Sequence, residues 1–587
     1  NGDYSIFPDM AQYPNPISLL EVTDKTTSDR VLVNGYLQAE PIKGLTLKAN
    51  LGVDRRYDKN KSYVPNTTVA GAAKGGIANI LQRDNIDYLM ELTANYTKDF
   101  GNHSLTALVG YSYQQFNQES VYAGNEDFST DGFLYNNLQA GAGTKPYVNS
   151  SARKSALGSY FARANYSYLG KYLLTVTVRA DGESNFHPDY RWGYFPSVSA
   201  GWRFSDEEFM KPLSSILSNG KLRASYGQTG NSNIGNYMTD SYGVVSGWVF
   251  GNDGYMGTAI TKRGNKKLTW ETTSEFNIGL DLGFFDNRIS LSMEYYNRII
   301  SDLLVSNKSL PAYNEINTIA ANIGKTQGRG FELTLSTVNI MNKDWTWSTD
   351  FTFYTFKDNW YERDPNWKPA AYESKKDPIR SYYSYVSDGL LQVGEKAPAW
   401  QPTLVPGQIK LKNLYDTGTS PNVLDQYDKV NLGSQDPKCT LGLNNTLRYK
   451  NLDFNIYFYG EIGRLRGASY YDAWIVGLGN SLTNVSQQSL HSYTNANQNT
   501  TVPNLIESAY DFGDYYHKKI NYLRCRNITL GYTIPVSKSI ANSVRISANV
   551  SNPFVFTNWN GVDPETDTGN FSYPNVTSFS FGIDISF

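Results

Sequence analysis

The final stretch of the chain alternates strictly between apolar and polar side chains, and this pattern constrains the fold more than any other feature. In residues 577–587, Phe579, Phe581, Ile583, Ile585 and Phe587 occupy every second position. A β-strand has a side-chain period of two, so the apolar and polar sets point to opposite faces of a sheet. The apolar face needs a cover, which is either a packed second layer in water or the lipid of a membrane.

Similar runs recur along the chain and predict about seventeen β-strands. The candidate strands cover residues 31–39, 45–55, 86–98, 104–117, 155–168, 172–182, 197–204, 221–228, 269–284, 289–304, 327–338, 345–356, 440–450, 452–463, 521–534, 543–556 and 577–587. Tight polar turns join many of them in pairs, at residues 41–44, 101–102, 169–171, 286–287, 341–344 and 451. Gly, Asn and Asp are the residues that such turns require.

The segments between these hairpins are long and rich in Asn, Gly, Ser, Tyr and Asp. They are residues 57–85, 118–154, 230–268, 305–326, 357–438 and 464–520. Loops beyond about 15 residues are uncommon in compact soluble domains. Long loops at one end and short turns at the other are typical of outer-membrane barrels. The sequence therefore predicts an all-β fold, namely a transmembrane antiparallel β-barrel with long extracellular loops and short periplasmic turns.

Composition narrows the classes of function. The net charge of −2 argues against a basic nucleic-acid binder. The mean hydropathy is negative, and no apolar run reaches the roughly 18 residues of a membrane-spanning helix, which excludes a helical membrane protein. The 45 tyrosines suit membrane-interface belts and ordinary sheets alike. The two cysteines, Cys439 and Cys525, are interpreted as fillers on strands and not as a disulfide framework or zinc site.

No pattern of catalytic or metal-ligating residues stands out in the sequence. The four histidines, His103, His187, His491 and His517, are scattered along the chain. The sequence has no H-E-x-x-H, G-x-S-x-G or Walker motif. We therefore predict no catalytic residues and no enzyme activity.

Strand direction sets a further expectation. If the short turns are periplasmic, residues 577–587 run downward, and counting back makes residues 31–39 run downward as well. A barrel must close, so at least one upward strand is expected before residue 31. We expect the chain to be a fragment of a barrel or one half of a two-chain barrel.

Several short segments follow one another in a recognisable order. The clearest is Arg191-Trp-Gly-Tyr-Phe-Pro-Ser-Val-Ser-Ala-Gly-Trp-Arg-Phe204, followed by Ser205-Asp-Glu-Glu-Phe209. The others are residues 222–231, 270–271, 277–281, 287–288, 294–296, 522–532, 561–565 and 573–574. Together they resemble the SusC-like TonB-dependent transporters (RagA/SusC type), which import glycans and peptides across the outer membrane.

The resemblance implies a barrel of about 22 strands around a plug. About 17 of them would lie in this chain, with residues 1–30 as the extracellular loop preceding the first strand and residues 31–587 as the C-terminal barrel portion. A carboxypeptidase-like module, the TonB box and the plug domain would lie upstream. They would be absent from this chain, in a missing N-terminal part or a separate polypeptide.

The resemblance also implies a function. The protein would be an active importer of oligosaccharides or peptides in the bacterial outer membrane, working with a SusD-like surface lipoprotein and energised through TonB. Its partners would be that lipoprotein, the TonB complex, the plug, membrane lipid and the cargo, and two SusC–SusD pairs would form a dimer. The alternatives are a passive porin without a plug and a barrel adhesin or enzyme.

Aromatic side chains near the loop ends of strands are candidates for stacking on cargo, with nearby polar groups to bind hydroxyls. The aromatic candidates are Trp248, Tyr255, Trp360, Trp367, Trp400, Tyr470, Tyr471 and Trp474. The polar candidates are Arg464, Arg466 and Asp472. Packing in loops or in an interface belt is the alternative role for each of them.

The family often carries an acidic, calcium-loop-like stretch after Pro-Gly-Asp, but Gln408 stands here where the first acid is expected. Only a weak calcium site near Asn413 and Asp416 follows, because Ca²⁺ prefers six to eight oxygen ligands.

Arg524 and Arg526 share the parity of Ile528 in an apolar row, so they are expected near the outer rim or past a β-bulge.

Overall fold

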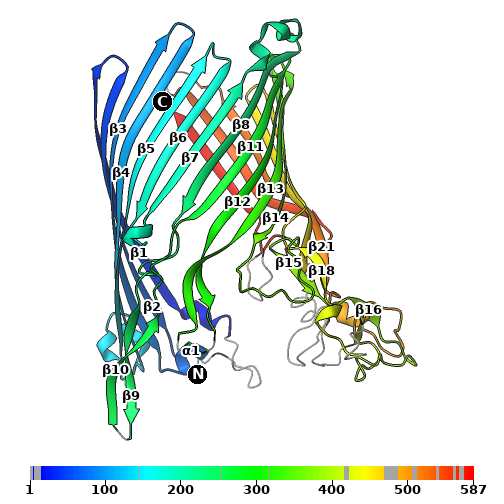
Figure 1. Cartoon of the computed structure of the whole chain (residues 1–587). Helices are drawn as coiled ribbons and strands as arrows, with labels where there is room; N and C mark the ends of the chain where they lie inside the picture. The colour runs from blue at the N-terminus through cyan, green and yellow to red at the C-terminus, as the bar shows by residue number, and fades with distance from the viewer. Residues whose placement is uncertain are drawn as a thin grey trace. The chain divides into compact units, whose positions relative to one another are not determined.

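The computed structural model describes residues 4, 15–143, 146–251, 253–311, 313–314, 316–415, 422–467, 487–504, 512–536, 541–559, 563–566 and 574–587 (Figure 1). Among these residues, helices are short: α1 covers Val69–Ala72. The 3-10 helices cover Ser18–Glu21, Asp131–Phe133, Leu138–Ala140, Pro188–Tyr190, Phe204–Asp206, Glu208–Leu213, Gln426–Asp428 and Gln487–His491. None of the helices in the described ranges has the length and apolar character needed to cross a membrane.

Within the described residues, the largest sheet has 17 strands, which confirms the predicted number. Its strands are β1 (Thr23–Ile42), β2 (Leu45–Val64), β3 (Ile77–Phe100), β4 (His103–Glu126), β5 (Tyr147–Tyr168), β6 (Tyr172–Glu183), β7 (Trp192–Trp202), β8 (Leu217–Asn231), β11 (Glu271–Phe284), β12 (Ile289–Ser309), β13 (Thr318–Met341), β14 (Trp345–Glu362), β19 (Cys439–Tyr449), β20 (Leu452–Gly467), β21 (His517–Ile534), β22 (Ser543–Thr557) and β23 (Ser578–Ser586). The pairs with a printed register are all antiparallel and join successive strands of the sheet.

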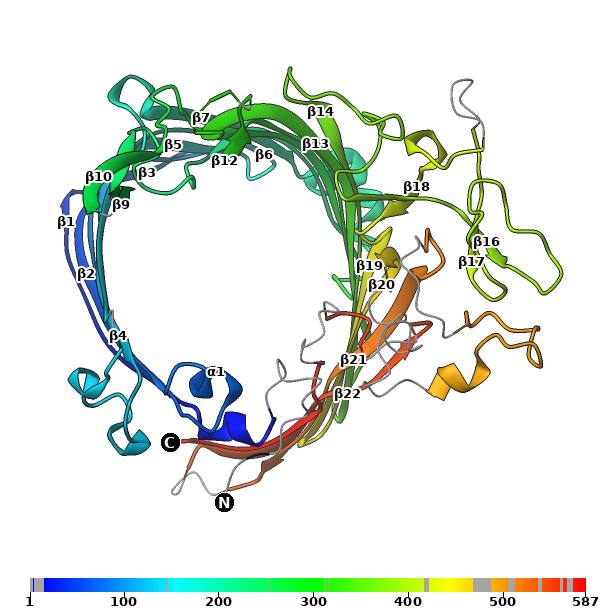
Figure 2. The same ribbon diagram turned by 90° about the horizontal axis from the view of Figure 1, so that it is seen from below.

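In the described parts of the longer connections there are three small two-stranded sheets. β9 (Tyr242–Phe250) pairs with β10 (Asp253–Lys262) as a hairpin. β15 (Ser381–Ser384) pairs with β18 (Val430–Ser434), and β16 (Ser387–Leu390) pairs with β17 (Ile409–Leu411). Figure 2 shows β16 beside β17, at a distance from β19 and β20. The connection between β14 and β19 therefore has a small fold of its own.

The chain divides into two compact units. Unit 1 contains Asn1–Val198, Gly227–Thr273 and Asp302–Ile323, and unit 2 contains Ser199–Tyr226, Ser274–Ser301 and Gly324–Phe587. β1–β6 belong to unit 1, and β14 and β19–β23 belong to unit 2. β7, β8 and β11–β13 contribute residues to both.

In unit 1, the strand register separates an apolar face from a polar face. One cross-strand row of partners is Ala39, Leu47, Ala94, Val109, Ala162 and Val178. The adjacent row, on the opposite face, is Gln38, Lys48, Thr93, Gly110, Phe161 and Arg179. Cross-strand neighbours share a face, so the period-two pattern of the sequence becomes a continuous two-sided wall.

Unit 2 repeats this arrangement. Its apolar rows include Leu335, Phe351, Leu443, Phe458, Cys525 and Phe554. The polar row beside it contains Ser336, Asp350 and Asn444, and Ser336 donates a hydrogen bond to Asp350 at 2.7 Å. Cys439 and Cys525 are both free thiols, and Cys525 fills a position in the apolar row.

The short turns lie where the sequence predicts them. Gly44, Gly101 and Gly170 have φ of +85°, +62° and +70°, a backbone region in which only glycine pays no steric cost. In the turn from β11 to β12, Asp286 and Asn287 both have positive φ as well, at +57° and +59°. These residues allow the strands to reverse direction within two to four residues, as tight hairpins require.

Many strands extend beyond their predicted ends. β1 begins at Thr23 and not at residue 31, and β2 pairs with β3 as far as Val64 and Ile77. Part of residues 57–85, which the pattern assigns to a loop, is therefore strand. Ion pairs such as Arg55 with Asp84 at 2.7 Å connect the two strands there. Where both faces meet water the apolar alternation stops, but the backbone hydrogen-bond ladder continues.

Candidate functional site

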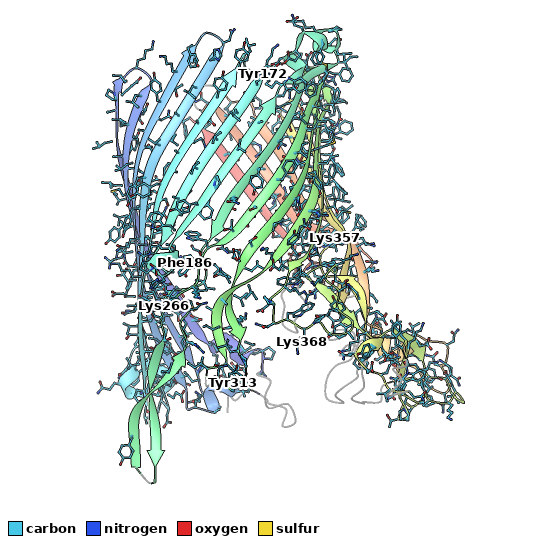
Figure 3. The ribbon with its side chains drawn as sticks, viewed as in Figure 1. Tyr172, Phe186, Lys266, Tyr313, Lys357 and Lys368 are labelled. Atoms are coloured by element: carbon cyan, nitrogen blue, oxygen red, sulfur yellow. The ribbon has the colours of Figure 1, made fainter. Side chains whose placement is uncertain are left out.

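In unit 1, Trp270 holds together two of the segments that carry the resemblance. Its indole Nε1 donates a hydrogen bond to the backbone oxygen of Arg191 at 2.7 Å. Its ring packs against Phe186, labelled in Figure 3, and Phe195, with ring centroids 5.7 and 5.4 Å away. A Cβ on Gly193 would lie 2.5 Å from the Phe195 ring, so this packing requires glycine. Trp270 is therefore a packing residue.

In unit 2, Arg223 of β8 connects two further segments of the resemblance. Its guanidinium pairs with Asp281 of β11 at 3.1 Å and with Glu294 of β12. Ser292 donates a hydrogen bond to Asp281 at 2.8 Å, and Asn277 donates one to Glu294 at 3.1 Å. Residues that are far apart in the sequence thus form one ion-pair network across three strands.

A β-bulge at Arg526 determines the direction of Arg524. Asn527 pairs with Tyr457, but Cys525 pairs with Phe458, so Arg526 is an extra residue in β21. The extra residue reverses the parity and places Arg524 opposite Tyr459, on the polar face. Of the two predicted explanations for these arginines, the bulge is confirmed.

The bulge brings Arg524 into a buried ion-pair network with the segment after β22. Arg524 is 3% exposed and pairs with Asp563 at 2.9 Å and with Glu565 at 2.5 Å. Arg526 pairs with the second oxygen of Glu565 at 2.5 Å. Three ion pairs thus hold residues 563–566 against β21. A buried carboxylate of this kind needs its partner, because an unpaired charge is costly in a low-dielectric environment.

The carboxyl group of Asp563 illustrates the balance of these forces. Burial raises its pKa, but the backbone N–H groups of Glu565, Asn575 and Thr566 and the charge of Arg524 lower it. The net result is a pKa below the ordinary value for aspartate. Asp563 is therefore a charged anchor for the segment that follows β22.

The predicted polar candidates Arg464 and Arg466 serve as anchors in the same region. Arg466 donates to the backbone oxygens of Asp563, at 3.2 Å, of Pro564, at 2.8 Å, and of Thr566. Its guanidinium also lies 5.0 Å from the centre of the Trp559 ring. Arg464 donates to the backbone oxygen of Gln435 at 3.1 Å and pairs with Glu461 at 3.3 Å. Both side chains join strand β20 to neighbouring loops.

Trp360 and Trp367 both lie near the guanidinium of Arg363, which is not among the predicted site residues. The Arg363 guanidinium lies 3.7 Å from the centre of the Trp367 ring and 5.5 Å from that of Trp360. Its Nε atom is buried and lacks a hydrogen-bond partner among the described residues. The spacing Trp-x-x-Arg-x-x-x-Trp was a usable signal, since arginine stacks well on aromatic faces. The guanidinium also pairs with Glu373 at 3.7 Å, so the cluster places flat apolar rings beside a positively charged group.

Trp400 belongs to the small fold between β14 and β19. Its Nε1 donates to the backbone oxygen of Leu411 at 2.8 Å. Leu411 packs in a buried cluster with Leu390, Ile409 and Tyr493, among others. Trp400 therefore makes a packing contact in this small fold. It is separated in sequence from Arg363 and its two tryptophans.

The remaining candidates are only partly described. Tyr255 on β10 is 53% exposed, and its backbone pairs with that of Trp248 on β9. Tyr470, Tyr471, Asp472 and Trp474 lie outside the described residues. Their roles as cargo contacts stay predictions.

The suggested calcium site also stays a prediction, because Asp416 lies outside the described residues. The described acid nearby is Asp428, which is fully buried. Its carboxylate accepts hydrogen bonds from the backbone N–H groups of Leu414 at 2.6 Å, Tyr415 at 3.0 Å and Asp425 at 2.9 Å. In the described part of the chain, no group of three or more His, Cys, Asp or Glu side chains is arranged for a metal. The carboxylate of Asp428 thus binds the backbone of a turn.

Comparison with known proteins supplies a family. Residues 2–552 match the family described as "TonB dependent receptor-like, beta-barrel". The chain is 32% identical over 619 residues to TonB-dependent receptor P3 of Formosa agariphila, covering 100% of this chain and 61% of that protein. It is 28% identical over 614 residues to TonB-dependent receptor SusC of Bacteroides thetaiotaomicron, covering 100% of this chain and 59% of that protein.

A solved structure, that of the RagAB peptide transporter, resembles the fold with a TM-score of 0.83 and 26% sequence identity. The match covers 97% of this chain and 63% of that one. The chain thus spans about three-fifths of the length of these relatives.

Proposed function

The chain belongs to the TonB-dependent receptor-like β-barrel family, whose barrels lie in the bacterial outer membrane, and from this premise we propose that it is the barrel of an active importer. The cargo is an oligosaccharide or a peptide. It enters from the outer face with the help of a SusD-like lipoprotein, and TonB supplies the energy. Import involves no covalent chemistry, so the protein acts as a transporter and not as an enzyme.

The observation that carries this proposal is the likeness to the RagAB peptide transporter over 97% of the chain. The two-sided wall is consistent with it, because an importer needs an apolar surface toward lipid and a polar surface toward the passage. A passive porin has such a wall too. The relatives, however, include two TonB-dependent receptors and a peptide transporter.

Within this proposal, the cluster of Trp360, Arg363 and Trp367 is the best described candidate for cargo contact. Two aromatic rings pack on the apolar faces of sugars or on side chains of peptides, and the guanidinium binds a hydroxyl or a carboxylate. Trp360 shares the polar face of β14 with Asp350 and Tyr354, because the register of this strand is unbroken between them. Its position favours contact with a passing solute.

Uptake in a strain without TonB tests the proposed energy source. The wild-type strain, a strain that lacks this protein and a strain that lacks TonB are given labelled oligosaccharides and labelled peptides. We expect cargo accumulation to fall to the background level in both mutants. Uptake that persists without TonB but disappears without this protein would favour the passive porin.

A pair of substitutions in β14 tests the cargo contact. Trp360→Ala removes a ring from the polar face, and Trp347→Ala removes one from the apolar face of the same strand. We expect Trp360→Ala to raise the half-saturating cargo concentration about tenfold, since one stacked ring contributes about 1–2 kcal/mol. Trp347→Ala should leave that concentration unchanged. Equal effects of both substitutions would assign Trp360 a purely structural role.

The proposed partner is tested by isolation from native membranes in mild detergent. A SusD-like lipoprotein should accompany the barrel in equal amount, and the complex should contain two such pairs. Repeated recovery of the barrel without any lipoprotein would contradict this part of the proposal.

A further inference from the structure

A cavity of about 420 Å³ lies in unit 2, beside the ends of β14, β19, β20 and β21 that are opposite to the tight turns. Three lysines line it, Lys357, Lys438 and Lys519, together with Asp358 and Asp436. Lys357 is labelled in Figure 3. All three lysines are exposed residues. Neither the importer function nor the resemblance makes use of this cavity.

The charges around the cavity leave an excess of cations. Within the described part of the chain, none of the three lysines forms an ion pair, whereas Asp436 is paired with Arg380 at 2.8 Å. Two glycines make room for the lysine stems. A Cβ on Gly463, where φ is +77°, would lie 2.8 Å from Cδ of Lys438, and Cε of Lys519 lies 3.8 Å from the Cβ position of Gly433. The backbone is thus shaped around the lysines, and their ammonium groups remain available.

The register places two of these lysines on the apolar, lipid-side face of the wall. Lys357 is four positions beyond Phe353 on β14, and Lys519 is four positions before Leu523 on β21. No extra residue interrupts either stretch, so each lysine shares a face with its apolar neighbour. Both lysines therefore continue the apolar rows beyond their last large apolar side chains.

The height of the lysines can be estimated from strand geometry. Trp345 to Phe353 spans about 27 Å along β14 at roughly 3.4 Å per residue, which is about 21 Å across the membrane for a strand tilt of roughly 40°. This agrees with an apolar band of about 25 Å. Lys357 lies about 14 Å further along the strand, or about 10 Å higher. That is the level of the lipid headgroups of the outer leaflet.

We propose that this cavity binds a phosphate group of a lipid headgroup in the outer leaflet of the membrane. Phosphate carries the charge that three unpaired ammonium groups attract, and lysine is a common phosphate ligand. The apolar rows below the cavity hold the acyl chains of the same lipid. A soluble phosphate would satisfy the charges but would gain nothing from this apolar surface.

The test measures lipid binding to the purified full chain in detergent by native mass spectrometry. The probes are diphosphorylated lipid A, the same lipid without phosphate, and glucose 1-phosphate as a soluble phosphate. We expect diphosphorylated lipid A to bind most tightly. The triple variant K357Q/K438Q/K519Q should weaken its binding by roughly one hundredfold, since each lysine near an anionic surface contributes about fivefold.

The matched control is K368Q/K375Q/K376Q, which removes the same charge from exposed lysines of the same loop region. It should retain the affinity of the wild type. Equal weakening in both triple variants would reduce the effect to general charge attraction and overturn the site. Equal binding of lipid A with and without phosphate would also overturn it. Glucose 1-phosphate binding as tightly as the lipid would assign the cavity to soluble phosphates and overturn the lipid source.

Discussion

The β2–β5 wall of unit 1 and the β20–β22 wall of unit 2 follow the same two-sided pattern but differ in regularity. The pairs β2–β3, β3–β4 and β4–β5 have no register shift. The pair β20–β21 has two shifts and β21–β22 has one. In the regular wall, the cross-strand ion pair of Arg55 and Asp84 is largely solvent-exposed, since 56% of the arginine side chain is accessible. In the irregular wall, the bulge turns Arg524 toward buried acids. Regular strand pairing thus gives a uniform two-sided surface, whereas a β-bulge creates specific contacts between side chains.

The largest expected difference between the two walls concerns their ion pairs. Arg524→Met leaves the carboxylates of Asp563 and Glu565 buried without this partner, at a cost of about 3–5 kcal/mol in the free energy of unfolding. The matched change Arg55→Met removes the partner of Asp84 from an ion pair whose arginine side chain is 56% exposed, and should leave the free energy of unfolding nearly unchanged. Urea unfolding in lipid vesicles measures both. Similar losses would show that regularity does not decide the strength of these contacts.

The second comparison tests whether both walls face lipid in the same way. Val109→Arg in unit 1 and Leu443→Arg in unit 2 place a charge in an apolar row, which should cost about 2–4 kcal/mol near the membrane centre. Thr93→Arg and Asn444→Arg place the same charge on the polar face and should cost under about 1 kcal/mol. Folding yield in vesicles, followed by electrophoretic mobility with and without heating, measures all four. A tolerated arginine in either apolar row would contradict the lipid-facing assignment of that wall.

The irregular wall should also respond to acid. The pKa of Asp563 is lower in the folded state than its ordinary value of 3.8. Its stabilising contribution is therefore complete above about pH 3.8 and is lost as the pH falls through the lower folded-state pKa. Hydrogen exchange of residues 563–566, measured as the pH is lowered, should show this segment loosening in strongly acidic solution. In Arg524→Met the loosening should begin at a higher pH, and an unchanged midpoint would contradict the role of the arginine.

The smallest expected effect concerns glycines within strands. A Cβ on Gly531 of β21 would lie 2.2 Å from Nη2 of Arg545 and 2.6 Å from the Asp453 carboxylate. Gly531→Ala should displace this half-buried ion pair at a cost of about 1 kcal/mol. A Cβ on Gly158 of β5 would meet no atom within 4 Å, so Gly158→Ala should be neutral or slightly stabilising. Thermal unfolding measures the stability of both variants. A destabilised Gly158→Ala would show that this position in β5 requires glycine for a reason other than the space around its Cβ.

The sequence predicts the wall well because its information is local. Period-two alternation identifies the strands, and turn residues such as Gly101 and Asn287 mark where they reverse. The family, the barrel fold and the outer-membrane location follow from the ordered segments and are confirmed by the match over residues 2–552. The predicted strands are too short because alternation disappears in water while backbone pairing continues, as between Val64 of β2 and Ile77 of β3.

The contacts of the irregular wall are harder to predict because they are not local. Arg466 donates hydrogen bonds to backbone oxygens that lie 97 and 98 positions further along the chain. No pattern near Arg466 indicates these contacts. A bulge leaves the composition of a strand unchanged, so Arg524 had two possible explanations in the sequence. The contact of Arg363 with two tryptophans corresponds to a visible spacing in the sequence but depends on the path of the chain after β14.

The additional residue at position 526 has a consequence for how such proteins change over time. A deletion of Arg526 would remove the bulge and its ion pair with Glu565, but it would leave Cys525 opposite Phe458 and Arg524 opposite Tyr459. A deletion of a paired residue beside it would instead shift the register and turn Arg524 to the apolar face. Hybrid barrels assembled from relatives should therefore be joined outside residues 524–527. The outer part of this strand and the segment at 563–566 are best exchanged as one inherited block.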